Sequence, residues 1–420
     1  MNRTTKILAS ALATGVLATV TACGGGDGST GGSSEEVTVL YRPGSLADSA
    51  VDGVQKAFPD AKIKLVKTAD VDTKLGAALR TGKDLPSIVT ADPIRYAPVG
   101  NKFTDVSKTG FTAGVAADYL PWKVELGKTD SGAQLGVPID VGPLAYYYNA
   151  EAFEAAGLPT DPGTVGKLVS TWDGYKSLAQ KAKAKGKFAC DDPAQLFYYE
   201  TWSKAFGFYK KDGDKLVPDI DNAIGKTAFD RAMDFQSSGL CLNVPSSSND
   251  WNSALNRGTL IGFLQPPWVG SGSLQTAVKA QSGKWRVATA TPDGYASADG
   301  SMLMVPKTST DPELATKVAI WLTNATNQAN GYVKNGLFPS ALGAYTAPEF
   351  TAPQPFYGGQ PAASVLADIS KKAPQIVKGP DTDSINAIFQ QAIRDAASNG
   401  ADASKAYNSA VDKATQQFGK

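Results

Sequence analysis

The sequence contains no histidine among its 420 residues. Ser-His and Cys-His nucleophilic pairs, zinc sites with histidine ligands and the usual general base at neutral pH are therefore excluded. The G-x-S-x-G elbow, the S-x-x-K motif and the G-x-x-x-x-G-K-[ST] phosphate loop are also missing. We expect no catalytic residue, no metal and no cofactor, although two carboxylates alone would suffice for a glycosidase.

An excess of one charge is also missing, because 41 lysine and arginine residues face 40 aspartate and glutamate residues. A protein with this balance has no overall field that attracts nucleic acid or a polyanion. No long basic run is present either. We therefore expect no nucleic-acid partner, and a ligand that is neutral or bound through a local patch.

Cysteine is scarce, and beyond the N-terminal region only Cys190 and Cys241 occur. In an oxidising exterior, an even pair of cysteines favours a disulfide over a metal site or a nucleophile. The sequence therefore predicts a Cys190–Cys241 disulfide. Two separate buried thiols are the alternative.

The first residues have the form of a lipoprotein signal. A positively charged start precedes an apolar run from Ile7 to Val20, and Val20-Thr21-Ala22-Cys23 has lipobox form. We predict a signal peptide over residues 1–22, lipidation of Cys23 and a flexible Gly/Ser tether over residues 23–36. An ordinary secretory signal with an incidental cysteine is the alternative. No later apolar run has spanning length, so a lipid anchor at the extracellular face of the cell membrane is expected.

Roughly 385 residues remain beyond the tether, more than one compact core usually contains, so two domains or lobes are expected. Strands and helices alternate from the start, which predicts α/β layers. The first predicted elements are a strand from Glu36 to Arg42, a helix from Ala47 to Phe58, a strand from Ala61 to Val66 and a short strand from Pro86 to Thr90.

Polar residues follow two of these strands. Ligands of open α/β sheets bind beyond the carboxyl ends of the strands, so Arg42, Ser45 and Asp92 are candidate ligand contacts. A turn or a helix cap explains Ser45 and Asp92 equally well.

A second candidate is Trp268, which an apolar strand from Thr259 to Leu264 delivers into a Gly-rich loop. An indole ring packs well on the C–H face of a sugar while polar neighbours bind its hydroxyl groups. The alternative is that Trp268 fills the core.

Three ordered motifs in the middle of the chain carry a resemblance to a known family. Tyr147-Tyr148-Asn149 precedes a capped helix, Ala156-Gly157-Leu158-Pro159 follows that helix, and Thr171-Trp172-Asp173 comes next. In this order they resemble the inter-lobe crossing of family 1 extracellular solute-binding proteins, the carbohydrate receptors of ABC importers. The resemblance continues through residues 301–307 and 335–340 and covers nearly the whole mature chain.

The resemblance implies a type II periplasmic-binding-protein-like fold, in which two α/β lobes are joined by a multi-segment hinge and close on the ligand. It assigns residues 37–139 and 292–339 to the N-terminal lobe, and residues 140–291 and 340–420 to the C-terminal lobe. The crossings are expected near Asp140, Thr291 and Pro339.

By the same resemblance, residues of both lobes line the ligand cleft. The tryptophan that stacks on the sugar in this family corresponds to Trp268, and Trp172 and Trp202 are expected to be structural. A buried helical position is the alternative for the aromatic residues near 197. The expected ligand contacts are Trp268, Asp92, Arg42, Ser45, Asp140, Phe197, Tyr198 and Trp251.

These features predict a monomeric, non-enzymatic receptor that captures a sugar, expected to be a di- or oligosaccharide. It would deliver the sugar to the permease of an ABC importer. One alternative keeps the fold and changes the ligand to a peptide, polyamine or oxyanion. The other is a secreted glycosidase.

Overall fold

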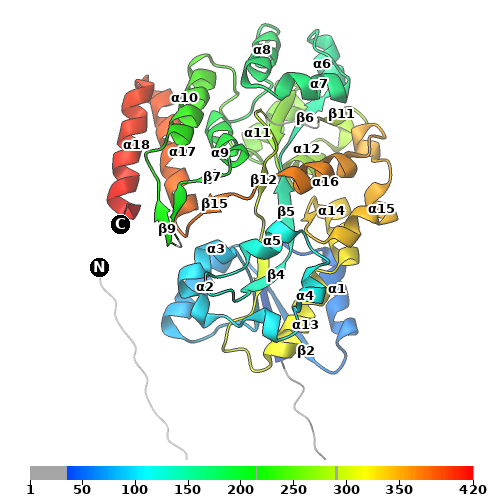
Figure 1. The fold of residues 1–420 in the computed structure, drawn as a ribbon. Helices are drawn as coiled ribbons and strands as arrows, with labels where there is room; N and C mark the ends of the chain where they lie inside the picture. The colour runs from blue at the N-terminus through cyan, green and yellow to red at the C-terminus, as the bar shows by residue number, and fades with distance from the viewer. Residues whose placement is uncertain (1–35, 214, 289–291, 420) are drawn as a thin grey trace, which may run out of the picture. The chain divides into compact units, whose positions relative to one another are not determined.

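The computed structural model describes residues 36–213, 215–288 and 292–419 (Figure 1). The predicted signal peptide, Cys23 and the predicted tether lie outside these residues, except for Glu36, which begins the first strand. Among the described residues, no helix is both long enough and apolar enough to cross a membrane.

A five-stranded sheet organises the N-terminal lobe, by which we mean this sheet and the helices packed on it. Its order is β2-β1-β3-β13-β4. β1 pairs in parallel with β2 and β3, whereas β13 runs antiparallel to β3 and β4. A segment from late in the chain thus completes the sheet. The strands are β1 Glu36–Tyr41, β2 Lys62–Lys67, β3 Ile88–Ala91, β4 Gly136–Pro138 and β13 Met302–Met304.

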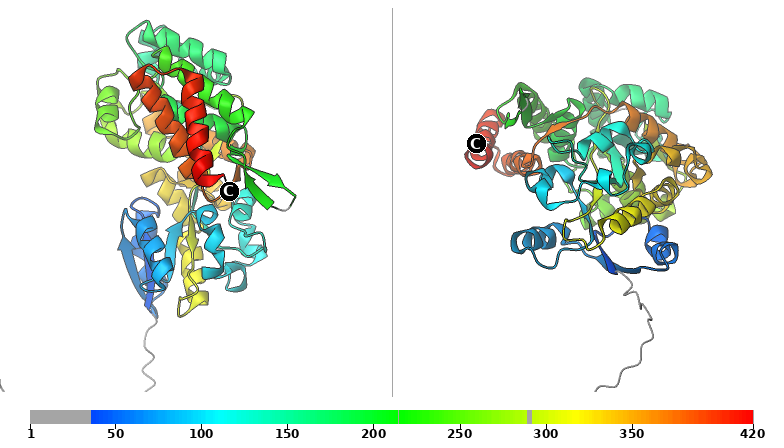
Figure 2. Two further views of the ribbon diagram at one scale, coloured as in Figure 1. Left: turned by 90° about the vertical axis from the view of Figure 1, so that its left-hand side faces the viewer. Right: turned by 60° about the horizontal axis from the view of Figure 1, so that its bottom comes forward.

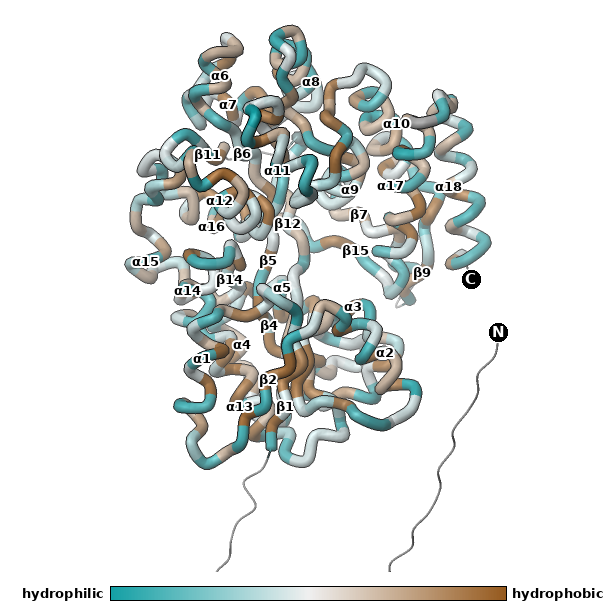
Figure 3. Tube along the Cα trace, turned by 180° about the vertical axis from the view of Figure 1, so that it is seen from behind, coloured by the Kyte–Doolittle hydropathy of each residue, from teal (hydrophilic) through white to brown (hydrophobic). Residues whose placement is uncertain are grey.

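Helices cover both faces of this sheet because its buried residues alternate. Val39 of β1 packs with helices α1 Asp48–Ala57 and α13 Pro312–Leu322, whereas Leu40 packs with α2 Val71–Thr81. Figure 3 shows hydrophobic residues concentrated along these strands and hydrophilic ones on the outer helices. The predicted early strands and helix are confirmed to within two residues at each end.

A three-stranded antiparallel sheet, β10-β6-β11, lies at the centre of the C-terminal lobe. Its strands are β6 Ala145–Asn149, β10 Gly262–Gln265 and β11 Trp285–Ala288. Every residue of β6 is buried, and its alternate side chains join two different hydrophobic clusters, one on each side. This burial explains why the sequence of β6 is almost entirely apolar and aromatic.

Two C-terminal helices, α17 Thr382–Asn399 and α18 Ala403–Phe418, complete the C-terminal lobe (Figure 2). They pack against α9 Pro193–Ser203 and α10 Ala223–Ser237 through an aromatic cluster that includes Phe229, Phe389 and Tyr407. Phe229, Ala232 and Met233 therefore belong to the core, in keeping with their helical spacing.

Three short strands run between the lobes and pair with one another in the order β12-β5-β14. β5 Asp140–Pro143 and β14 Phe338–Pro339 lie at two of the predicted crossings. The third crossing was expected near Thr291, which lies outside the described residues, and the third strand is β12 Ser297–Ala298. The chain thus forms a two-lobed α/β fold whose connections make a small antiparallel sheet.

The remaining elements are short or lie at the periphery. They are α3 Pro93–Tyr96, α4 Ala113–Ala116, α5 Pro121–Leu126, α6 Ala150–Ala155, α7 Pro162–Val169, α8 Trp172–Lys183, α11 Asn249–Asn256, α12 Leu274–Ala277, α14 Ala325–Asn335, α15 Pro348–Thr351, α16 Ala362–Lys372, β7 Phe206–Gly207, β8 Tyr209–Asp212, β9 Lys215–Pro218 and β15 Val377–Lys378.

Several local predictions are confirmed. Asn149 caps α6 by accepting a hydrogen bond from the Ala152 amide at 3.0 Å. Cys190 and Cys241 form the predicted disulfide. The Gly-rich segment after β10 differs from its prediction as a loop, because residues Trp268–Ser273 form a π-helical turn that continues into α12.

Candidate ligand-binding site

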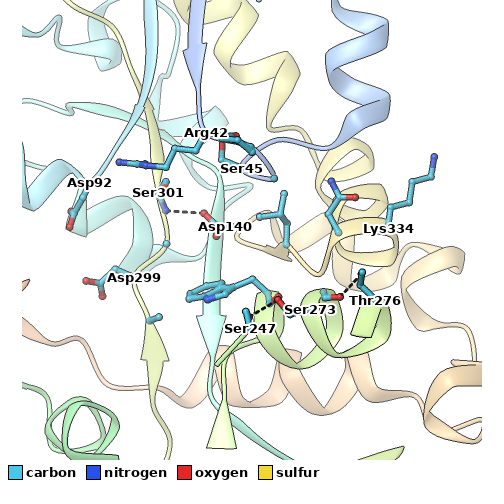
Figure 4. Close-up of a pocket in the computed structure, with 18 of the residues that line it drawn as sticks. Arg42, Ser45, Asp92, Asp140, Ser247, Ser273, Thr276, Asp299, Ser301 and Lys334 are labelled. Atoms are coloured by element: carbon cyan, nitrogen blue, oxygen red, sulfur yellow. Dashed lines mark hydrogen bonds between the residues drawn. The ribbon is translucent and has the colours of Figure 1, made fainter. Parts of the chain in front are cut away.

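A cavity of about 1040 Å³ lies beside the crossing strands and is lined by residues of both lobes (Figure 4). This volume is at the upper end of the usual range for small-molecule sites. Six of the eight expected ligand contacts line it: Arg42, Ser45, Asp92, Asp140, Tyr198 and Trp268.

The N-terminal lobe contributes residues that follow the parallel strands β1 and β3. Arg42 pairs with Asp72 at 2.7 Å, and the Ser45 hydroxyl donates to the Arg42 carbonyl at 2.8 Å. Asp92 caps α3 by accepting from the Ile94 amide at 2.9 Å. Burial raises the pKa of Asp92, and the positive charge of Lys378 opposes this rise. Ser45 and Asp92 thus have the local roles that their sequence context suggested and also face the cavity.

Asp140 lies at the start of the crossing strand β5 and is only 7% exposed. Its Oδ1 accepts a hydrogen bond from the Ser301 amide at 2.8 Å, shown dashed in Figure 4. Burial raises the pKa of Asp140, and the fully buried Lys123 opposes this effect. The hydrogen bond from Ser301 therefore fixes the carboxyl group at the hinge.

A buried ion pair between Lys378 and Asp299 forms part of the cavity wall, and sequence reasoning missed both residues. Burial alone would lower the pKa of Lys378, but the charge of Asp299, with Tyr198 and Asp383 nearby, raises it instead. The Lys123 ammonium group donates to the carbonyl oxygen of Asp299. Asp299 is thus held from the N-terminal lobe through its backbone and from β15 through its side chain.

Trp268 begins the π-helical turn and is half-buried at the cavity wall. Its ring packs directly on Gly142 of β5, where a Cβ atom would overlap the indole. A glycine on the central crossing strand thus makes room for the tryptophan. The ring is held against the hinge on one side and faces the cavity on the other.

Tyr198 lies on α9 and donates a hydrogen bond to Asp383 Oδ1 at 3.2 Å. Its ring centroid is 4.0 Å from that of Trp202, which also lines the cavity although its sequence context predicted only a structural role. Trp202 is 5% exposed, so it serves mainly as support for Tyr198.

Phe197 and Trp251 correct the expected set, because the structure places both in the core with no exposed surface. Phe197 stacks on Phe389 at 5.5 Å. Consecutive helical residues point about 100° apart, so Tyr198 reaches the cavity while Phe197 does not. Trp251 Nε1 donates to Asp191 Oδ2 at 3.3 Å, away from the cavity.

The other end of the cavity carries hydroxyl and amide groups from α11, α12, α14 and the π-helical turn. Figure 4 shows Ser247, Ser273, Thr276 and Lys334 on one side, and Asp92 and Asp299 on the other. We call the first set, with Asn252 and Asn335, the hydroxyl end. The Ser247 hydroxyl donates to Ser273 Oγ at 2.8 Å. These small polar residues belong to no recognisable sequence motif, so the sequence did not predict this end of the cavity.

The cavity can bind a polar solute, and its donor set offers little for a metal. Across the described residues, no group of three or more His, Cys, Asp or Glu side chains is arranged to hold a metal ion. The lining instead combines aromatic rings with carboxylates, hydroxyls, amides and three basic residues, Arg42, Lys334 and Lys378. Such a set suits a solute with many hydroxyl groups.

Comparison with known proteins agrees with this geometry. A curated lactose-binding protein of Rhizobium radiobacter is 26% identical over 364 residues, covering 81% of this chain and 82% of that protein. A crystal structure of an extracellular solute-binding protein of family 1 superposes with a TM-score of 0.82 at 26% identity, covering 91% of this chain and 99% of that one.

The galacto-N-biose/lacto-N-biose I-binding protein of Bifidobacterium longum, solved with lacto-N-biose, superposes with a TM-score of 0.76 at 22% identity and covers 92% of this chain and 98% of its own. The family of bacterial extracellular solute-binding proteins matches residues 49–356, which is most of the chain. Members of this family are non-enzymatic components of solute transport. The chain belongs to the bacterial extracellular solute-binding proteins.

Proposed function

We propose that this chain is a sugar receptor that binds a disaccharide or short oligosaccharide in the cavity and delivers it to the permease of an ABC importer. The observation that carries the proposal is the half-buried ring of Trp268 at the wall of a cavity otherwise rich in carboxylates, hydroxyls and amides. The C–H face of a sugar would stack on the indole ring. The polar groups would bind the sugar hydroxyls and fix their orientation.

Two relatives support a disaccharide as the ligand. One is named for lactose, and the other was solved with lacto-N-biose. The cavity volume of about 1040 Å³ leaves room for more than one sugar unit.

Delivery would depend on closure of the two lobes about β5, β12 and β14. We propose the lobe boundaries predicted above, residues 37–139 with 292–339 and residues 140–291 with 340–420. The closed, sugar-bound shape would be the form that the permease recognises. We also propose that the receptor is a monomer, with residues 1–22 as a signal peptide, Cys23 as the lipidated residue and residues 23–36 as the tether.

A ligand screen tests the proposal on residues 35–420, which form one compact unit. Thermal unfolding is measured with lactose, lacto-N-biose and a panel of mono- and oligosaccharides, with amino acids as controls. A ligand at a hundred times its Kd stabilises by about 2.7 kcal/mol, which raises Tm measurably. A selective rise with one sugar, and unchanged sugar afterwards, is expected. No rise with any sugar would overturn the sugar assignment.

An amine-bearing solute is a second candidate, because four aspartates line the cavity: Asp92, Asp140, Asp299 and Asp383. Arg42, Lys334 and Lys378 offset most of this charge, so the sugar remains the first choice. Spermidine and amino sugars belong in the same screen. A rise in Tm with spermidine alone would favour this second candidate.

A further inference from the structure

The turn that carries Trp268 has a hydrogen-bond pattern wider than that of an α-helix. The Leu274 amide donates to the carbonyl of Val269, five residues back. In an α-helix the same amide would donate to the carbonyl of Gly270, four residues back. The π-helical pattern therefore leaves the Gly270 carbonyl without its α-helical donor.

Tyr357, which follows Phe356 in a short turn before α16, reaches this carbonyl from outside the helical turn. Its hydroxyl donates to the Gly270 carbonyl at 2.8 Å. Because this bond uses the only hydroxyl proton of Tyr357, the 3.1 Å contact with Ser271 Oγ has the serine as donor. Tyr357 has no exposed surface, so water cannot replace it without opening the core. A buried carbonyl without a donor would destabilise the turn.

The turn is also held by close packing at two glycines. A Cβ atom on Gly270 would overlap the ring of Tyr147, which lies in the central strand β6. A Cβ atom on Gly336, at the end of α14, would overlap the backbone of Gly272. Both contacts restrict movement of the turn as a whole. The hydrogen bond from Tyr357 instead favours the wider π-helical hydrogen-bond pattern over the α-helical one.

The width of the turn decides where Trp268 points. A π-helical turn contains one residue more than an α-helical turn. If the Leu274 amide took the Gly270 carbonyl instead, the residues before the turn would rotate by about 100° relative to α12. Trp268 is the first of these residues, and its ring would leave its position over Gly142.

We propose that Tyr357 is a positioning residue for ligand binding, whose hydroxyl holds the widened turn and thereby keeps the Trp268 ring at the cavity wall. The consequence for affinity rests on the proposed function, in which Trp268 stacks on a sugar. The width of the turn itself is independent of any ligand.

The test compares Tyr357→Phe with a matched control, Tyr148→Phe, in residues 35–420. Tyr148 is equally buried and donates to the Thr160 carbonyl at 2.7 Å, so its loss also removes one hydrogen bond to a backbone carbonyl. Hydrogen exchange of residues 266–278 is measured without ligand, and lactose is titrated by calorimetry. Tm of both variants records the general loss of stability.

We expect Tyr357→Phe to speed exchange in residues 266–278 about fivefold or more, whereas Tyr148→Phe leaves it unchanged. Lactose affinity should fall about fivefold in Tyr357→Phe, because only the fraction with the widened turn binds tightly. Ser271→Ala should change both readouts in the same direction by less. Unchanged exchange in Tyr357→Phe would overturn the proposal, as would equal changes in Tyr148→Phe.

The proposed function and the proposed role of Tyr357 can be refuted independently of each other. If the unaltered protein binds neither lactose nor any other sugar, the proposed function is wrong, and the exchange measurement alone decides the role of Tyr357.

Discussion

The two ends of the cavity are built in different ways. At the end with Asp92 and Asp299, which we call the carboxylate end, the charged groups already have protein partners: Lys378 pairs with Asp299, and Asp140 accepts from the Ser301 amide. At the hydroxyl end, Thr276 and Lys334 are exposed, and Ser247 and Ser273 bind each other at the surface. The first end is therefore part of the architecture that connects the lobes. The second end can vary at little structural cost, and we infer that it adapts the cavity to a particular solute.

The largest effect is expected from breaking the buried ion pair. Lys378→Met leaves Asp299 buried without its cation, and we expect the free energy of unfolding to fall by about 3–5 kcal/mol. Denaturant unfolding measures this loss. The double variant Lys378→Met with Asp299→Leu should recover part of it, since the two charges of the pair are removed together while Asp92 still loses the opposing charge of Lys378. The half-exposed Arg42–Asp72 pair is a control, and Asp72→Asn should cost about 1 kcal/mol or less. Equal losses in both pairs would contradict the comparison.

A buried carboxyl group that has no cationic partner provides a second test of how buried charges affect stability. Asp191 accepts from two neutral side-chain donors, Trp251 Nε1 and Gln265 Nε2, and burial raises its pKa to about 7 despite the Gln265 bond. Its folded pKa thus lies above its unfolded value. This group therefore stabilises the fold fully below about pH 4, and the stabilisation is lost as the pH rises towards and through 7.

We expect the free energy of unfolding to fall by a few kcal/mol between pH 4 and pH 8 through Asp191. Asp191→Asn should remove this part of the slope, as measured by denaturant unfolding at several pH values. The slope of the unaltered protein serves as the reference. A wild-type slope that Asp191→Asn leaves intact would show that other groups cause it.

Removing the indole ring is expected to affect binding more than folding. Trp268→Ala should lower sugar affinity by about 2 kcal/mol or more, or about 30-fold, because a central aromatic contact is lost. Calorimetry measures this change. Trp321 is also half-buried but lies in the core of the N-terminal lobe near Gly53, so Trp321→Ala should leave affinity unchanged. Unchanged affinity in Trp268→Ala would refute the stacking role.

The smallest effects are expected at the hydroxyl end. Ser273→Ala and Thr276→Val should change the free energy of unfolding by no more than about 0.5 kcal/mol, because Thr276 is exposed and Ser273 is only half-buried. Their effect should instead appear as altered preference among disaccharides, measured as ratios of Kd. A stability loss comparable to that of Lys378→Met would show that the two ends do not differ.

Cavity residues that directly follow a predicted strand could be located from the sequence. Cavity residues on or beside very short strands that pair with distant segments could not. Arg42 and Asp92 follow parallel strands that the apolar pattern revealed, and their side chains reach the cavity. Lys378 lies on a two-residue strand, and Asp299 follows another, so neither carries a periodic signal.

Aromatic residues on helices were harder to assign to the core or to the cavity. Adjacent helical residues project about 100° apart, so a shift of one position changes where the side chain points. Phe197 and Tyr198 are neighbours, yet one is core and the other lines the cavity. Trp251 faces the sheet, while its neighbour Asn252 reaches the cavity. The sequence pattern did not fix the rotation of these helices.

The contact between the Trp268 ring and Gly142 gives the protein a built-in optical reporter. The ring touches the central crossing strand on one side and faces the cavity on the other, so solute capture and rotation of the lobes both alter its surroundings. Indole fluorescence, compared with that of a Trp268→Phe variant, would then follow capture in real time without an attached dye. A receptor of this design is a ready starting point for a label-free biosensor.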